Sequence, residues 1–281
     1  MQFNSILKPA SIDLHRRQLL RNGAFGALGA FALTNPLAAR MAYAALGDTS
    51  TVEVTEGPYF IDESLNRSDI RYNISDNVYQ DGLPLLLTIK VLTLDTSTGE
   101  VTPLENAYVD IWHCNAAGLY SGVSAGQQGA DTTDQNFLRG YQVTKRRGRV
   151  RFRTIYPGWY LPRAPHIHCK IRQFSGASTS LEFTTQFAFD DEISNLIYTT
   201  VSPYTNRGVS PVGNDADQIF TGSNSCLADE EAGESLQLAL SGVGSYMMAR
   251  FRVLIDPNMR CTSTETGNGG GMGGGPPLVG R

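Results

Sequence analysis

The chain has 281 residues, 41% of them hydrophobic, which is enough for one large folded domain or at most two. Its 27 acidic residues outnumber its 23 basic residues, and the formal net charge is −4. An acidic chain without a basic stripe is a poor binder of nucleic acid, so we expect no nucleic-acid partner.

Residues 1–44 have the features of a twin-arginine export signal. The pair Arg16 and Arg17 is followed by a Gly- and Ala-rich apolar run over residues 23–33 and by small residues ending at Ala44. This run of about 11 residues is too short to span a bilayer. We therefore predict a Tat-type signal that is removed on export to the periplasm or the extracellular space, with no membrane span. Its removal takes away five basic residues and one acidic residue, which leaves a charge of about −8.

From about residue 51 the chain alternates between apolar and polar residues, with turns between the alternating stretches. Within residues 166–174, for example, Ile167, Cys169 and Ile171 fall on one face. The predicted strands cover residues 85–94, 107–112, 149–156, 166–174, 182–189 and 246–255. Short strands at close intervals predict an all-β antiparallel sandwich or barrel. We expect the sandwich, with short helices and long loops.

The remaining segments give weaker indications. Residues 190–198 fit a short helix, and residues 229–240 fit a short helix or a loop. Residues 262–281 are rich in Gly and Pro and too poor in apolar residues to pack, so we expect a disordered tail and a folded domain over residues 45–261. Cys226 and Cys261 lie outside the predicted strands and are candidates for one disulfide, whereas Cys114 and Cys169 could equally be buried free thiols.

A pair of histidines carries the most specific chemical signal. His166 and His168 are two residues apart in a predicted strand, so their side chains share a face, with Cα atoms roughly 6–7 Å apart. Two such imidazoles can converge on one metal ion. Tyrosines lie nearby, and a phenol is a poor zinc ligand that a hard trivalent cation can hold as phenolate. Iron(III) is therefore the favoured metal.

Other metal motifs fit less well. A cupin would need a glutamate four residues after His168, where the chain has Arg172. A site of two histidines and one carboxylate would need an acidic neighbour, which neither Ala164 nor Lys170 supplies. The chain has no HExxH motif, its cysteine spacing does not suit zinc, and His113 falls on a face that is typical of core.

Several stretches together resemble the intradiol ring-cleavage dioxygenases. They read VDIWHCNAAGLYS at residues 109–121, FLRG at 137–140, RFRTIYPGWY at 151–160 and RAPHIH at 163–168. The similarity extends to EGPYF at residues 56–60 and to Thr185 and Gln186. It therefore covers roughly residues 55–189, with agreement in order and residue type and mostly in spacing.

This resemblance implies a single non-haem iron(III) with four protein ligands, Tyr120, Tyr160, His166 and His168. In the family pattern Tyr160 is the tyrosinate that a substrate displaces. Arg163 falls where the family places a cation beside the substrate ring, and Gln186 matches the family's pocket glutamine. Arg163, Tyr160 and Gln186 are thus the candidate catalytic residues.

The implied reaction inserts O₂ into a catechol-type aromatic to give a cis,cis-muconate-type product, with iron as Lewis acid and template. The linker between Tyr160 and His166 is compressed relative to the protocatechuate branch, and we recognise no helical dimerisation segment of the catechol branch. The particular catechol and the oligomeric state therefore stay open, a homodimer being one option. The alternatives are a non-catalytic β-sandwich binding module on the same scaffold and a zinc or copper metalloenzyme.

Overall fold

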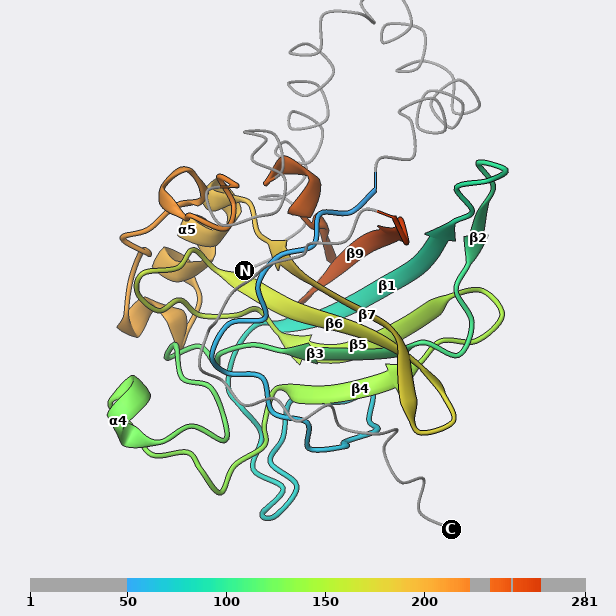
Figure 1. Ribbon diagram of the computed structural model, residues 1–281. Coiled ribbons are helices and arrows are strands. Elements are labelled where there is room, and N and C mark those ends of the chain that lie inside the picture. Colours follow the sequence, from blue (N-terminus) through green and yellow to red (C-terminus); the bar gives the residue numbers. More distant parts are fainter. Residues whose placement is uncertain (1–49, 223–232, 244, 259–281) are drawn as a thin grey trace, which may run out of the picture.

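The computed structural model describes residues 50–222, 233–243 and 245–258. Two β-sheets in this part of the chain stack face to face, and the helices α4 and α5 lie beyond the same end of the strands, on the left in Figure 1. The predicted β-sandwich is confirmed.

The first sheet contains five strands: β1 (Pro84–Leu94), β2 (Val101–Pro103), β5 (Arg149–Ile155), β8 (Ala239–Val243) and β9 (Tyr246–Ile255). β1 is its centre, because β5 and β2 pair along one edge of β1 and β9 pairs along the other. The pairs are antiparallel except for β1 with β9, which is parallel, so the expectation of purely antiparallel sheets was wrong at this pair. A parallel pair has to be joined by a long crossover, and here the second sheet lies in the connection.

The second sheet contains β3 (Tyr108–Trp112), β4 (Arg139–Val143), β6 (His166–Ser175) and β7 (Ser178–Ala188), in the order β4-β3-β6-β7. All of its pairs are antiparallel. Trp112, the last residue of β3, pairs with His168 near the start of β6. The last residues of β3 and the first residues of β6 therefore lie side by side at one end of the second sheet.

The core lies between the sheets and explains the alternating sequence. On β6, Ile167, Cys169 and Ile171 point into the core and are fully buried. Leu87 and Phe152, opposite each other on β1 and β5, belong to the same cluster. Each such side chain contributes about 1.5–3 kcal/mol when it leaves water. The opposite face of β6 is consequently free to carry polar side chains, including both histidines.

Helices are few in the described part of the chain. The predicted helix at residues 190–198 is α5 (Asp191–Thr200), whose first turn is capped by the Asp190 carboxylate accepting from the Ile193 amide. α4 (Ala125–Gln128) is a single turn, and three 3₁₀ helices span Tyr204–Asn206, Asn214–Ala216 and Glu234–Leu236.

Residues 229–240 were expected to be a helix or a loop, and the described portion is neither throughout. It contains the 3₁₀ turn Glu234–Leu236 and then enters β8. Cys114 and Cys169 are both free and buried. The export signal, the proposed Cys226–Cys261 disulfide and the tail at residues 262–281 lie outside the described residues. Within the described residues, no helix is long and apolar enough to cross a membrane.

Candidate metal centre

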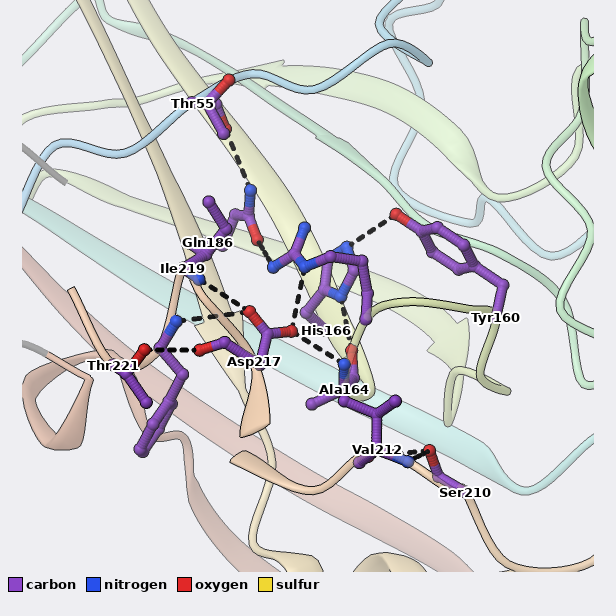
Figure 2. A network of polar contacts seen from close by, with 12 residues as sticks. Thr55, Tyr160, Ala164, His166, Gln186, Ser210, Val212, Asp217, Ile219 and Thr221 are labelled. Atoms are coloured by element: carbon purple, nitrogen blue, oxygen red, sulfur yellow. Dashed lines mark hydrogen bonds and ion pairs between the residues drawn. The ribbon is translucent and has the colours of Figure 1, made fainter. Parts of the chain in front are cut away.

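The side-chain tips of four predicted ligands converge. His168 Nε2 lies 3.0 Å from His166 Nε2 and 3.1 Å from Tyr120 Oη. His166 Nε2 lies 3.5 Å from Tyr120 Oη and 3.4 Å from Tyr160 Oη, the last contact being visible in Figure 2. One phenol oxygen from residue 120 and a phenol oxygen and two imidazole nitrogens from residues 160–168 thus share one small space.

Two glycines allow the tyrosines to meet. Gly118 has a φ of +79°, and its amide donates to Asn115 O to close a tight turn. A Cβ at Gly118 would overlap the carbonyl oxygen of Trp159. A Cβ on Gly158 would lie 2.5 Å from Asn115 O. The segments that carry Tyr120 and Tyr160 therefore touch backbone to backbone, which brings the two phenols together.

Strand register and stacking orient the histidines. His168 pairs with Trp112 across β3 and β6, and the two rings stack at 4.8 Å with an interplanar angle of 6°. Gly57 passes over the ring edge, where a Cβ would be 3.3 Å from His168 Cε1. Trp112 is thus a buried side chain that also supports a site residue.

The imidazoles present neutral nitrogens. Burial and the nearby charge of Arg163 lower the pKa of His166 to about 3, and burial lowers that of His168 well below its usual range. Ala164 O can only accept a hydrogen bond, so His166 Nδ1, 2.6 Å away, is the protonated nitrogen of that ring. Its Nε2 lone pair then points at the other three groups. His168 Nδ1 is buried without a hydrogen-bond partner among the described residues.

The donor set fits a hard metal ion. Two donors about 2.0–2.2 Å from a first-row metal ion, at angles near 90–110°, are separated by about 2.8–3.6 Å, the range observed here. Burial raises the pKa of Tyr120 well above 10 and that of Tyr160 to about 12. Such phenols release their protons only to a strong, highly charged Lewis acid, which favours a trivalent cation over zinc.

A second network holds Arg163 beside this cluster. Its Nε donates to Asp217 Oδ2 at 2.9 Å and one terminal nitrogen donates to Gln186 Oε1 at 2.7 Å. Gln186 in turn donates to Thr55 O, and Asp217 accepts from the Ala164 amide, as Figure 2 shows. Burial alone would raise the pKa of Asp217, but the charge and hydrogen bonds of Arg163 outweigh it and lower that pKa. Arg163 keeps a side-chain exposure of 16% and can therefore face a ligand.

The segment at residues 56–62, here called the strap, covers the outer face of the site. Tyr59 stacks on Tyr120 with ring centroids 4.5 Å apart, and Phe60 packs against Trp112 at 4.9 Å. Lys170 binds Glu56 at one end of the strap, and Arg172 binds Asp62 at the other, 2.6 Å away. The strap therefore closes one side of the site with aromatic rings.

All six predicted site residues are brought into one region, with the four proposed ligands at its centre and Arg163 and Gln186 beside them. His113 is separate: its ring nitrogens bond to Cys114 O and to Thr154 Oγ1 at 2.8 and 2.6 Å, which is the satisfied core histidine that was expected. The sequence missed Asp217, which sits in a loop 54 residues from Arg163, with no local pattern to mark it.

Comparison with known proteins supports the resemblance. The family model described as a dioxygenase (Dioxygenase_C) matches residues 55–202, more than half of the chain. The chain belongs to the intradiol ring-cleavage dioxygenase family. Among curated proteins, chlorocatechol 1,2-dioxygenase from Pseudomonas putida is 28% identical over 153 residues, which are 48% of this chain. The chain spans about half of that relative, since the match covers 52% of its length.

Solved structures of the family agree in fold. An intradiol ring-cleavage dioxygenase from Tetranychus urticae is 30% identical, with a TM-score of 0.58 over 76% of this chain and 98% of that one. A further dioxygenase crystal structure is 29% identical, with a TM-score of 0.59 and the same shares of the two chains. The protein is therefore a homologue of intradiol dioxygenases, and the residues of its site can be compared with what ring cleavage requires.

Proposed function

We propose that this protein is an iron(III)-dependent intradiol dioxygenase that cleaves catechol-type aromatics with O₂. The observation that carries the proposal is the convergence of Tyr120, Tyr160, His166 and His168, with neighbouring donor atoms 3.0–3.5 Å apart. Iron(III) in this position would act as a Lewis acid that binds a catecholate and makes its ring reactive toward O₂.

The two tyrosines differ in a way that suits a displaceable ligand. Tyr120 is 1% exposed and is held under the strap, whereas Tyr160 is only partly buried. A diol entering from solvent reaches Tyr160 first. Once released, the Tyr160 phenolate oxygen can take up a proton from a hydroxyl of the diol, as a general base does.

Arg163 supplies the charge that such a reaction needs beside the ring. Asp217 and Gln186 fix its orientation, so no side chain has to reorganise as negative charge develops on a bound aromatic. Gln186 acts on Arg163 in this arrangement and is a positioning residue. Tyr59 and Phe60 of the strap cover the site beside Tyr120 and Trp112.

Oxygen uptake by purified, iron-loaded protein with a panel of catechols tests the proposal. We expect O₂ consumption equal to the muconate formed and a red colour from tyrosinate–iron(III) charge transfer. Tyr160→Phe should shift the visible band and slow substrate binding, while Tyr246→Phe, an exposed tyrosine of β9, should change neither.

Three results would contradict the proposal. Colourless active protein that contains zinc or copper would indicate another metalloenzyme. Catechol binding without O₂ uptake would indicate a binding module on the same scaffold. An unchanged visible spectrum in Tyr160→Phe would show that Tyr160 is not a metal ligand.

Export is a separate proposal that depends on the sequence of residues 1–44 alone. We infer twin-arginine translocation to the periplasm or beyond. Replacing Arg16 and Arg17 by lysine should retain the protein inside the cell, and secretion unaffected by this change would rule the route out.

A further inference from the structure

Three neighbouring strands of the first sheet carry positive charge and no acidic residue. β1, β5 and β9 contain no aspartate or glutamate. Their outward positions carry six basic side chains, Lys90, Arg149, Arg151, Arg153, Arg250 and Arg252. The register aligns Arg149, Lys90 and Arg252 in one row across the three strands, and Arg151 and Arg250 flank Thr88 in the next row.

The turn before β5 enlarges this surface. Lys145, Arg146 and Arg147 are all exposed. The amide of Val91 donates to Gly148 O, which ties the turn to β1 beside Lys90. We call these nine residues the basic face; they make up nine of the 23 basic residues in a chain whose net charge is −4.

Most of the basic face differs from the other cationic groups in the described part of the chain; the exceptions are Arg252, which has an interaction of its own, and Arg153, whose charge lowers the pKa of Asp69. The other seven described basic residues all make hydrogen bonds or ion pairs, and they are Arg67, Arg71, Arg139, Arg163, Lys170, Arg172 and Arg207. By contrast, the charged side-chain groups of Lys90, Arg149, Arg151 and Arg250 make no hydrogen bond or ion pair with another described residue. Positive charge that no internal group neutralises is available to an external anion.

The shape of the basic face restricts the partner. Outward residues two apart on a strand are about 6.6–6.8 Å apart, and neighbouring strands are about 4.8 Å apart, so the charges form a broad lattice rather than a pocket. Phe152 and Phe251 point inward, and Tyr246 at the start of β9 is the only aromatic residue of these three strands that points outward. The basic face therefore lacks the aromatic side chains that stack on single-stranded bases or insert into a bilayer, and it lacks the protruding shape that enters a duplex groove.

We propose that the basic face binds an acidic polysaccharide, a chain of sugars carrying carboxylate or sulfate groups. Guanidinium groups pair with such anions through two parallel hydrogen bonds, and a flat lattice of them can follow an extended polymer. The contact is electrostatic and weakens as salt rises.

The basic face and the candidate metal centre lie on opposite sides of the sandwich. The inward residues of β1, β5 and β9 pack in the same core as Ile167 and Cys169 of β6, while His166 and His168 point away from that core. A protein held through the basic face therefore presents its site to solvent. Binding and catalysis are consequently separable by experiment.

Titration of the full chain with polygalacturonate, a polymer of carboxylated sugars, tests the proposal. We expect binding that weakens about tenfold or more between roughly 50 and roughly 200 mM NaCl, and no binding to neutral dextran. The variant Arg149→Ser/Arg151→Ser/Arg250→Ser should lose at least about tenfold in affinity at the lower salt concentration. Arg151→Ser alone should lower the slope of log affinity against log salt by about one.

Arg71→Ser is the matched control, since it removes one partly buried positive charge that is paired with Asp69 and does not belong to the basic face. It should leave the affinity and the salt slope unchanged. Equal losses in Arg71→Ser and Arg151→Ser would overturn the proposal. So would failure to bind polygalacturonate, or tighter binding to duplex DNA or to anionic phospholipid vesicles. Oxygen uptake by all these variants should match the parent protein, which separates this test from that of the proposed function.

Discussion

Three buried histidines have the same residue type but different hydrogen-bond partners, and the partners decide what each can do. Both ring nitrogens of His113 are bonded to protein groups, so it has no lone pair to offer a ligand. His166 donates through Nδ1 to a carbonyl and presents Nε2 to the cluster. The carbonyl of Ala164 therefore fixes the proton on Nδ1 of His166 and leaves Nε2 free to bind a metal ion.

Asp217 is the residue whose role the structure reveals most clearly, because it accepts from both Arg163 and the Ala164 amide. Asp217→Asn removes the charge that orients the guanidinium. We expect kcat/KM for a catechol to fall roughly 10–100-fold while the iron content stays the same. Oxygen uptake and metal analysis measure the two quantities.

Asp215→Asn provides the control for this change, since Asp215 is exposed in the 3₁₀ helix Asn214–Ala216, which ends just before Asp217. It should keep full activity. A parent-like kcat/KM in Asp217→Asn would mean that Arg163 needs no carboxylate to stay in position.

At the scale of elements, the turn that carries Tyr120 depends on close backbone packing against Gly158. Gly158→Ala would place a Cβ 2.5 Å from Asn115 O, which is backbone and cannot rotate away. We expect a loss of about 1–3 kcal/mol in the free energy of unfolding and weaker iron binding, because Tyr120 moves with the turn. Urea unfolding and an iron titration check this expectation.

Gly126→Ala is the matched substitution, because Gly126 lies in α4 with its nearest neighbour atom 4.0 Å from the new Cβ. It should be neutral or stabilising. If Gly158→Ala bound iron as tightly as the parent protein, the backbone contact would not be what positions Tyr120.

The strap is fastened to β6 by buried charge. Arg172 bridges Asp62 of the strap and Asp110 of β3 at 2.6 and 2.9 Å. Burial outweighs the attraction of Arg172 and raises the pKa of Asp110 to about 6. Arg172→Met leaves that carboxylate buried without its partner, so we expect a loss of about 3–5 kcal/mol at neutral pH. Urea unfolding should show this loss, and the added change Asp110→Asn should restore part of it; no recovery in the double variant would assign the loss to packing instead.

At the scale of the whole molecule, the strands with long alternating patterns of apolar and polar residues could be predicted from the sequence. β1, β5, β6, β7 and β9 each have seven or more residues with one apolar face, and all were expected. The edge strands β2, β4 and β8 have only three to five residues and were not predicted. Their positions depend on pairing with neighbours, which no local pattern records.

The same distinction holds for the candidate site and the basic face. The proposed ligands lie in motifs with recognisable spacing, whereas Asp217 and the strap reach the site only through tertiary packing. The basic face could not be predicted from the net charge, because the chain as a whole is acidic. Six basic residues at positions 145–153 were visible in the sequence, but their alignment with Lys90, Arg250 and Arg252 follows from strand register.

The buried histidines make the stability of the whole molecule sensitive to acid. Burial lowers the pKa of His113 from 6.5 to about 4, so the unfolded chain takes up a proton that the folded protein refuses in that interval. The stabilisation is complete above pH 6.5 and is lost as the pH falls toward 4. For metal-free protein we expect His113 to account for about 2 kcal/mol of the loss between about pH 7 and about pH 5.

Asp110 works in the opposite direction, because its raised pKa favours the folded state as pH falls through about 6. The effect of His113 must therefore be isolated by comparison. His113→Gln replaces the ring with an amide that does not titrate and that can still reach Thr154. Denaturant unfolding at both pH values should show a smaller pH-dependent loss in His113→Gln than in the parent, whatever the absolute stability of the variant. Equal losses would mean that the acid sensitivity arises at His166 and His168, whose neutral rings metal binding requires.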